Sequence, residues 1–249
     1  MVRTPIEQWT SRLESALDGD GGRPGRVIVL RETDSTQDAA RRLDAKPADI
    51  VVAWRQTAGR GRLGRTWADT HEQGIAATIV AERAPAERLA IACAVGVAQA
   101  AEALLGRSVG IKWPNDIVVD GRKLAGVLIE QSDQRALIGI GMNVLQTHWP
   151  QELAGRAVSL VQLGGRVDRI DALVALLRAM NQALRLPQEQ LIAEFSRRDV
   201  LQGVRATFRT GLRTVSGTVI RTDPMRGLVV RTDADMVYLP AATTTLLSD

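Results

Sequence analysis

Residues 109–144 decide the fold, and their sequence is VGIKWPNDIVVDGRKLAGVLIEQSDQRALIGIGMNV. Apolar runs alternate here with two turn signals, Asp120-Gly121 and Asp133-Gln134. The pattern predicts strand, turn, strand, turn and strand. Because short hairpins pair strands antiparallel, we expect a mixed, largely antiparallel sheet rather than a fully parallel one.

The flanking sequence places further strands and helices around this sheet, so the predicted fold class is α+β. Apolar residues at a spacing of three or four indicate helices, and short β-branched runs indicate strands. Pro85 suits the first turn of a long alanine-rich helix, and Asp34 or Ser35 suits a helix cap. We predict strands at 27–30, 50–54 and 74–80, and helices at 6–17, 36 to about 43, 85–105 and, separated at Pro187, twice between 168 and 198.

The sequence changes after about Val200 to short β-rich runs separated by turns. Four such runs predict a small β-barrel of about 50 residues. A glycine-rich stretch at 19–22 predicts a flexible link near the other end. We therefore expect an N-terminal helix and linker at 1–25, a central domain at 26–199 and a barrel at 200–249, with barrel strands at 206–208, 215–221, 227–231 and 236–239.

The composition excludes several classes of protein. The 249 residues are 45% apolar, which is enough for a sizeable core. Cys93 is the only cysteine, so no intrachain disulfide forms, and its side chain is expected to be buried. The start lacks the apolar segment of a signal peptide, and no apolar run has the length of a membrane span. These features predict a cytoplasmic protein, and a net charge of +4 does not by itself indicate nucleic-acid binding.

A polar, glycine-rich loop separates two predicted strands at residues 56–72, with GRGRLGR at 59–65 as its centre. Glycines allow backbone amides to approach a ligand closely. Arginines supply paired donors for carboxylate or phosphate. The position between strands excludes a Walker A loop or a Rossmann fingerprint. The segment is an anion-binding loop, a solvated basic loop or an RNA-binding segment.

Two of only three lysines lie in the region richest in motifs, at Lys112 and Lys123. Lysine offers a compact point charge where arginine offers a planar fork. Lys112 begins KWPND, in which Asp116 can hold Mg²⁺ and Lys112 can neutralise a phosphate. The alternative is a β-turn with a surface ion pair. Lys123 opens an apolar strand and can present its ammonium to a pocket or extend it to solvent.

Two glycines in one predicted strand, Gly139 and Gly141, leave room for something to pack flat against it. An adenine ring would fit such a surface, and so would a closely packed helix.

Together these motifs resemble the biotin–protein ligase family. The resemblance covers roughly residues 27–145 and extends to the barrel. It implies a central domain related to class II aminoacyl-tRNA synthetases, followed by an SH3-like barrel. The matching pieces are Asp34-Ser35-Thr36-Gln37, Gln56, Ala58 to Arg62, Gly64-Arg65, Trp67, Lys112 to Asp116, Lys123 to Gly126 and Gly139 to Val144.

The resemblance implies a role for each matching residue. Leu63 stands where many members carry arginine, and Gln37 stands where asparagine is common. Expected catalytic residues are Lys112, Lys123, Arg60, Arg62 and Asp116, with Asp116 also the metal ligand. Expected biotin-binding residues are Ser35, Thr36, Gln37, Gln56, Gly59, Arg60, Gly61, Arg62, Lys123 and Gly126, and expected ATP-binding residues are Arg60, Arg62, Arg65, Trp67, Asn115, Lys123 and Asn143.

The activity that the resemblance implies is ATP-dependent ligation. ATP and Mg²⁺ would activate biotin as biotinyl-AMP, and the biotinyl group would pass to a lysine of a biotin carboxyl carrier protein domain of a carboxylase. Loop 57–71 is expected to close over the adenylate and exclude water. A homodimer is one assembly that the resemblance allows. Sequence-specific DNA binding is not expected, because 25 residues are too few for a helix-turn-helix domain.

Three alternatives remain at this point. Lipoate–protein ligases share the superfamily and the chemistry, although the combination of glycine–arginine loop and KWPND favours biotin. A biotin-responsive regulatory binding protein would need a DNA-binding segment. An RNA-binding protein would need stacking platforms, and only 3% of the residues are aromatic.

Overall fold

The computed structural model describes residues 4–18, 25–68, 72–241 and 243–248. The predicted linker at 19–22 lies outside these residues. The helices are α1 (Trp9–Leu17), α2 (Thr36–Arg42), α3 (Ala86–Leu105), α4 (Arg169–Arg185) and α5 (Gln188–Ser196). The strands are β1 (Val27–Thr33), β2 (Ile50–Gln56), β3 (Gly74–Glu82), β4 (Gly110–Lys112), β5 (Asp116–Val119), β6 (Arg122–Gln131), β7 (Arg135–Asn143), β8 (Arg205–Thr210), β9 (Arg213–Asp223), β10 (Gly227–Arg231), β11 (Met236–Pro240) and β12 (Thr244–Ser248).

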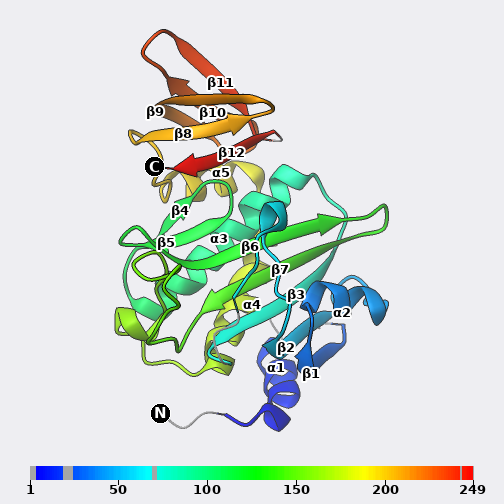
Figure 1. The fold of residues 1–249 in the computed structure, drawn as a ribbon. Helices are drawn as coiled ribbons and strands as arrows, with labels where there is room; N and C mark the ends of the chain where they lie inside the picture. Colours follow the sequence, from blue (N-terminus) through cyan, green and yellow to red (C-terminus); the bar gives the residue numbers. More distant parts are fainter. Residues whose placement is uncertain (1–3, 19–24, 69–71, 242, 249) are drawn as a thin grey trace.

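Seven strands form the central sheet in the order β1-β2-β3-β7-β6-β5-β4 (Figure 1). Only β1 and β2 pair parallel, and the other neighbours pair antiparallel. The prediction of a mixed, largely antiparallel sheet is therefore confirmed. Residues 109–144 contain four strands rather than the predicted three, because Trp113-Pro114-Asn115 separates β4 from β5.

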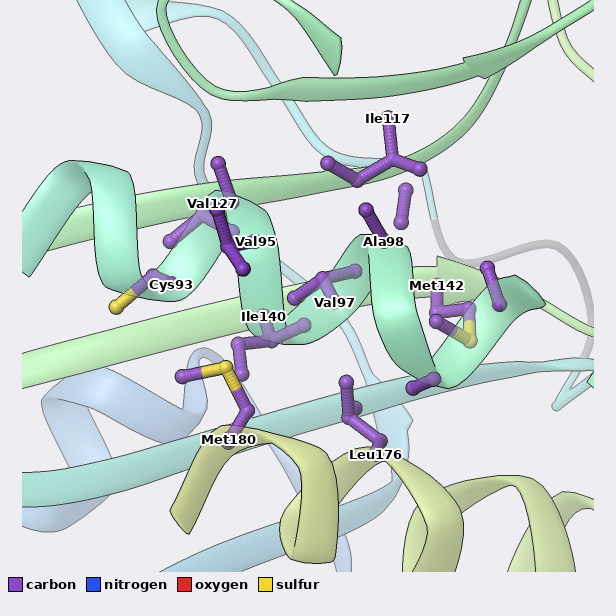
Figure 2. Packing of buried hydrophobic residues seen from close by; sticks show 14 of the residues in the cluster. Cys93, Val95, Val97, Ala98, Ile117, Val127, Ile140, Met142, Leu176 and Met180 are labelled. Atoms are coloured by element: carbon purple, nitrogen blue, oxygen red, sulfur yellow. The ribbon is translucent and has the colours of Figure 1, made fainter. Parts of the chain in front are cut away.

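One face of the sheet packs against α3 and α4 and forms the main core (Figure 2). Gly96 lets the two helices approach closely, since a methyl group added there would lie 3.0 Å from Met180 Sδ. Cys93 is buried as predicted, and burial raises the pKa of its thiol. Helix α3 is long and apolar enough to cross a membrane, but 61% of its most apolar stretch is buried in this core, which accounts for its composition.

The opposite face carries a smaller apolar cluster under α2. Ala39 and Ala40 of this helix pack on Val51, Val80 and Leu137 from three neighbouring strands. Alternate strand residues point to opposite faces. Val51 and Leu137 therefore face α2, whereas their neighbours Val52 and Ile138 face the main core.

The C-terminal unit is a separate five-stranded sheet in the order β11-β10-β9-β8-β12. Four of its strands were predicted, and β12 was not, because Thr244–Ser248 is a short mixture of threonine and leucine at the end of the sequence. Arg198, which is only 4% exposed, lies just before this sheet and pairs with Glu102 and Glu194 at 2.6 Å each. The bounds predicted for the three units remain predictions.

Candidate active site

Alternate residues of each strand point to the same face, and this places several predicted site residues on the α2 face of the sheet. Lys112 pairs with Asp116, Asp116 with Gly126, and Gly126 with Gly141. Directly opposed residues share a face, so these four lie in one row across β4, β5, β6 and β7. A register shift between β5 and β6 places Lys123 opposite Val118, on the same face of the sheet as this row.

A salt bridge lies at the centre of this row, between Lys123 Nζ and Asp116 Oδ1 at 2.6 Å. Both side chains remain about one-third exposed. The ammonium also stands 5.5 Å from the centre of the Trp67 ring, within the range of a cation–π contact. Lys123 therefore has a charged partner and an aromatic partner at the surface of the sheet.

The Trp67 indole lies flat on the glycines of the sheet. A methyl group added at Gly141 would be 2.3 Å from the indole Cε2, and one at Gly126 would be 3.4 Å from its Cζ3. The sequence predicts an adenine ring or a helix against the glycines of β7. In this structure Gly141 accommodates an aromatic side chain from the glycine–arginine loop.

The glycine–arginine loop forms a narrow turn over the site. Trp67 N–H donates to Gly59 O at 2.9 Å, and Gly61 N–H donates to Arg65 O at 2.7 Å. A side chain at Gly59 would collide with Gln56 Nε2 at 2.5 Å. Residues 59–67 therefore reverse direction, and Trp67 lies on the sheet beside Gln56.

The three arginines of the loop have different surroundings. Arg62 Nη1 donates to Asn115 Oδ1 at 3.4 Å and so joins the loop to the turn between β4 and β5. Burial lowers the pKa of the Arg62 guanidinium, Asp116 raises it, and Arg65 lowers it further. A half-buried guanidinium favours an incoming anion. Arg65 is exposed at the edge of the same cluster.

Arg60 is held to one side by acidic groups. Its Nη2 lies 2.9 Å from Glu130 Oε2 and 3.1 Å from Asp38 Oδ1. Arg41 contacts the same two carboxylates at 2.8 and 2.6 Å. Arg60 would have to exchange these partners to meet a ligand in the central row.

The start of α2 closes the other end of the site. Thr36 N–H donates to Gln56 Oε1 at 2.9 Å, and both side chains are buried. Ser35 is the cap residue, but no side-chain hydrogen bond caps the helix. Asp34 instead accepts from Ser35 N–H at 2.7 Å, and two contacts from Arg42 hold the pKa of Asp34 well below its usual range. The helix and its cap residue were predicted correctly, and the cap forms without a side-chain hydrogen bond.

Gln37 and Asn143 make structural contacts with the backbone. Gln37 Nε2 donates to Leu128 O and Leu137 O at 3.2 Å each, and its side chain packs on Gly139. Asn143 Nδ2 donates to Lys123 O and Val158 O at 3.2 and 3.1 Å. In both residues the amide donors hold strands and loops together, and their roles in ligand binding stay predictions.

The donor set suits a magnesium ion that arrives with a phosphate ligand. Asp116 is a carboxylate in the central row, and among the residues that the structure describes no three His, Cys, Asp or Glu side chains are grouped to hold a metal. Mg²⁺ commonly binds through one or two carboxylates and substrate phosphates, so Asp116 fits that arrangement.

Sequence reasoning missed three polar residues beside the site. Asp38 and Glu130 were not singled out because each looks like an ordinary surface acid in its own element. Thr78 was missed because a threonine within GIAATIV matches a β-branched strand residue. No local signal identifies any of them, since their partners lie far away in the sequence.

Comparison with known proteins agrees with this geometry. The model of the biotin/lipoate A/B protein ligase family matches residues 27–145. The biotin–[acetyl-CoA-carboxylase] ligase of Mycobacterium tuberculosis is 32% identical over 220 residues, which cover 82% of this chain and 81% of that protein. The chain belongs to the biotin/lipoate A/B protein ligase family.

Other relatives of this ligase-family chain carry names that include a second activity. The bifunctional ligase/repressor BirA of Bacillus spizizenii is 37% identical over 163 residues, covering 58% of this chain. The match spans only half the length of that curated relative. A structure of the biotin protein ligase from Aquifex aeolicus in complex with biotin and ATP superposes with a TM-score of 0.80 at 27% identity, covering 90% of this chain and 99% of that one.

Proposed function

We propose that this protein is an ATP-dependent biotin–protein ligase. It joins biotin to AMP and then transfers the biotinyl group to a lysine of a biotin carboxyl carrier protein. The observation that carries the proposal is the position of Lys123. Its ammonium stands beside Asp116, Gly126 and the ring of Trp67, under a loop that carries three arginines.

Biotin binds on the α2 face of the sheet, between the start of α2 and Lys123. Its polar head meets Ser35, Thr36 and Gln56 at the start of α2, and its carboxylate points to Lys123. Gly59 and Gly126 allow Gln56, Trp67 and Lys123 to lie close to the backbone along this path. The nucleotide occupies the side of Arg62, Arg65, Asn115 and Asn143.

Ligand binding requires Trp67 to move. Its indole now covers Gly126 and Gly141, where a ligand lying on the sheet would need the same surface. When the ring lifts, it can pack against the adenine instead. The loop thereby exchanges an internal contact for a contact with the ligand.

In the first step, a carboxylate oxygen of biotin attacks the α-phosphorus of ATP, the bond to the β-phosphate oxygen breaks, and pyrophosphate leaves. Two anions must approach each other, so the barrier is largely electrostatic. Lys123, Arg60 and Arg62 offset the repulsion, and Lys112 neutralises phosphate charge. When bound with ATP, Mg²⁺ would be held by Asp116 and the phosphates and would supply further positive charge.

In the second step, the amine of the carrier lysine attacks the carbonyl carbon of the mixed anhydride, and AMP leaves. The attacking amine loses a proton, and Asp116, the carboxylate beside Lys123, is the proposed acceptor. Its salt bridge with Lys123 orients it until then. The closed loop meanwhile limits hydrolysis of the anhydride.

Mass spectrometry tests the proposal. The purified protein is incubated with ATP, Mg²⁺ and biotin, and in parallel with lipoate in place of biotin. We expect biotinyl-AMP in the first sample, no lipoyl-AMP in the second, and a mass increase on an added carrier domain. Lipoyl-AMP alone would support the lipoate alternative. The absence of both adenylates would refute the ligase.

A further inference from the structure

A buried arginine at the start of α4 bridges the place where β2 and β3 separate. The ladder between these two strands ends at the pair of Ala53 with Ala76. Just beyond this pair, Arg169 Nη2 donates to Trp54 O and Arg169 Nε donates to Gly74 O, at 2.8 Å each. The arginine is only 2% exposed. Its guanidinium therefore joins the two strands where their own pairing has stopped.

The two carbonyls that accept from Arg169 lie at the two ends of the glycine–arginine loop. Trp54 lies two residues before the end of β2, and Gly74 is the first residue of β3. On their outer sides the two strands stay paired, β2 with β1 and β3 with β7. The guanidinium thus links the β1–β2 part of the sheet to the β3–β7 part at the base of the loop.

Aromatic rings and the helix cap hold this guanidinium in place. Arg169 Cζ lies 4.6 Å from the centre of the Trp54 ring and 5.0 Å from that of Trp9 in α1, within the range of cation–π contacts. Asp168, the cap residue of α4, accepts from the backbone N–H groups of Arg169 and Thr4 at 2.7 Å each. Arginine suits this place because its planar fork can stack on rings and still donate to two carbonyls.

The same arginine borders the part of the loop that rests on the sheet. Arg169, Trp67, Ala68 and Gly74 line one small cavity. Trp67 is the residue that moves in the proposed function when a ligand takes its place on Gly141. Arg169 is therefore next to the moving part of the loop as well as to its two ends.

We propose that Arg169 is a positioning residue for closure of the glycine–arginine loop: by holding Trp54 O and Gly74 O together it fixes where the ends of the loop stand over the site. This inference rests on the proposed function, in which the closed loop retains biotinyl-AMP. Lys123 and Asp116 lie on other strands and keep their places without it. Loss of the bridge therefore speeds the escape of the adenylate more than it slows adenylate formation at saturating biotin and ATP.

Limited proteolysis with trypsin tests the position of the loop without any ligand. Arg169→Lys keeps the charge but lacks the fork that spans two carbonyls, and one lost charge-assisted hydrogen bond corresponds to about a tenfold change in an equilibrium. We expect cleavage after Arg62 to be about tenfold faster than in wild type. Cleavage after Arg213, which is exposed at the start of β9, should be unchanged. Arg178→Lys is the matched control, because Arg178 also lies on α4 and donates to a backbone carbonyl of α1.

Retention of biotinyl-AMP tests the effect on the reaction. Each protein forms the adenylate from saturating biotin, ATP and Mg²⁺, and rapid gel filtration then separates bound from released biotinyl-AMP over time. In Arg169→Lys the release rate should rise about tenfold, and the adenylation rate should change less than threefold. A first-order release rate does not depend on the fraction of protein that is folded, so a mere loss of folded protein would not produce this result.

A second variant keeps Arg169 and removes one of the rings that stack on it. Trp54→Leu leaves the backbone carbonyl in place, and the fold should tolerate it because Trp54 is only half-buried. We expect at least a twofold rise in cleavage after Arg62 and in adenylate release. This variant carries the test if Arg169→Lys does not fold.

Several results would overturn the positioning role. Unchanged cleavage after Arg62, or an equal rise in cleavage after Arg213, would show that Arg169 does not act on the loop. A wild type and variants that retain biotinyl-AMP equally well would refute the positioning role and leave the ligase intact. A folded wild type that forms no biotinyl-AMP would refute the ligase, and the trypsin comparison would still test whether Arg169 holds the loop.

Discussion

The two faces of the central sheet differ in what covers them. On one face α3 and α4 pack against apolar residues such as Ile140 and Met142 (Figure 2), and the buried Arg169 at the start of α4 donates to the backbone carbonyls of Trp54 and Gly74. On the other, α2 covers only part of the sheet, and a loop with arginines and Trp67 meets the rest. Alternate residues of the same strands build both faces, so one set stabilises the fold while the other is available for chemistry.

Glycine has a different purpose on each face. Gly96 lets α4 approach α3, with Met180 Sδ 3.0 Å from the position of an added methyl group. Gly141 accepts the Trp67 ring, a contact that must break when ligand binds. The close approach is permanent on the face covered by α3 and α4, the core face. It is reversible on the face partly covered by α2 and the glycine–arginine loop, the open face. Changes on the core face should therefore affect stability, and changes on the open face should affect activity.

The largest expected effect is on the open face. Lys123→Ala removes the ammonium beside Asp116, and we expect a loss of about 10²–10³-fold in adenylation rate. Thermal stability should change little, because the side chain is partly exposed. Pyrophosphate exchange and a thermal melt measure the two quantities. Lys46→Ala, at a surface ion pair with Asp44, is the control, and near-normal exchange in Lys123→Ala would remove its assigned role.

Overpacking the core face should give the opposite result. Gly96→Val forces Met180 and Ala183 of α4 away from α3, and we expect a loss of about 2 kcal/mol in the free energy of unfolding. Urea denaturation followed by circular dichroism measures it. Exchange activity at a temperature where the variant is folded should equal that of wild type. A normal midpoint with lost activity would contradict the division between the faces.

Acid should weaken the ion pairs of Arg198 with Glu194 and Glu102, just before the barrel. Hydrogen bonds from Arg198 lower the pKa of Glu194 to about 2. A depressed pKa means that this stabilisation is present above the ordinary value of 4.5 and is lost as pH falls from there toward 2. With allowance for solvent screening we expect about 1 kcal/mol. Glu194→Gln should reduce the dependence of the free energy of unfolding on pH in that range. An unchanged dependence would argue against the ion pair of Glu194 with Arg198.

The smallest expected effect concerns the contact between Gly141 and Trp67. Gly141→Ala should push the indole off the sheet and raise its accessibility to acrylamide, while unfolding free energy changes by less than about 0.5 kcal/mol. Fluorescence quenching measures the accessibility. The difference from wild type should disappear in a Trp67→Phe background. Equal quenching with and without the methyl group would mean that the ring does not rest on Gly141 in solution.

Local patterns in the sequence were enough to predict most of the fold. Turn signals at Asp120-Gly121 and Asp133-Gln134 correctly predicted the hairpins of the sheet, because hairpin geometry depends on a few adjacent residues. Pro85 and Pro187 correctly predicted where helices begin and end, since proline restricts its own backbone and lacks a donor. The family resemblance was confirmed as well.

Contacts between distant residues could not be predicted. Gln37 was expected at the ligand, and whether its amide meets Leu137 O or a ligand depends on a residue 100 positions away. The salt bridges of Arg60 with Glu130 and the hydrogen bond of Thr78 with Thr36 have the same origin. The motifs identified which residues gather at the site, and only the fold shows which of them already have partners.

Biotin-dependent exchange of labelled pyrophosphate into ATP tests most directly the central claim, that the open face of the sheet activates biotin. We predict exchange that requires biotin, is not supported by lipoate, and falls about 10²–10³-fold in Lys123→Ala. A folded wild-type protein that shows no exchange with biotin, or the same exchange with lipoate, would contradict the account.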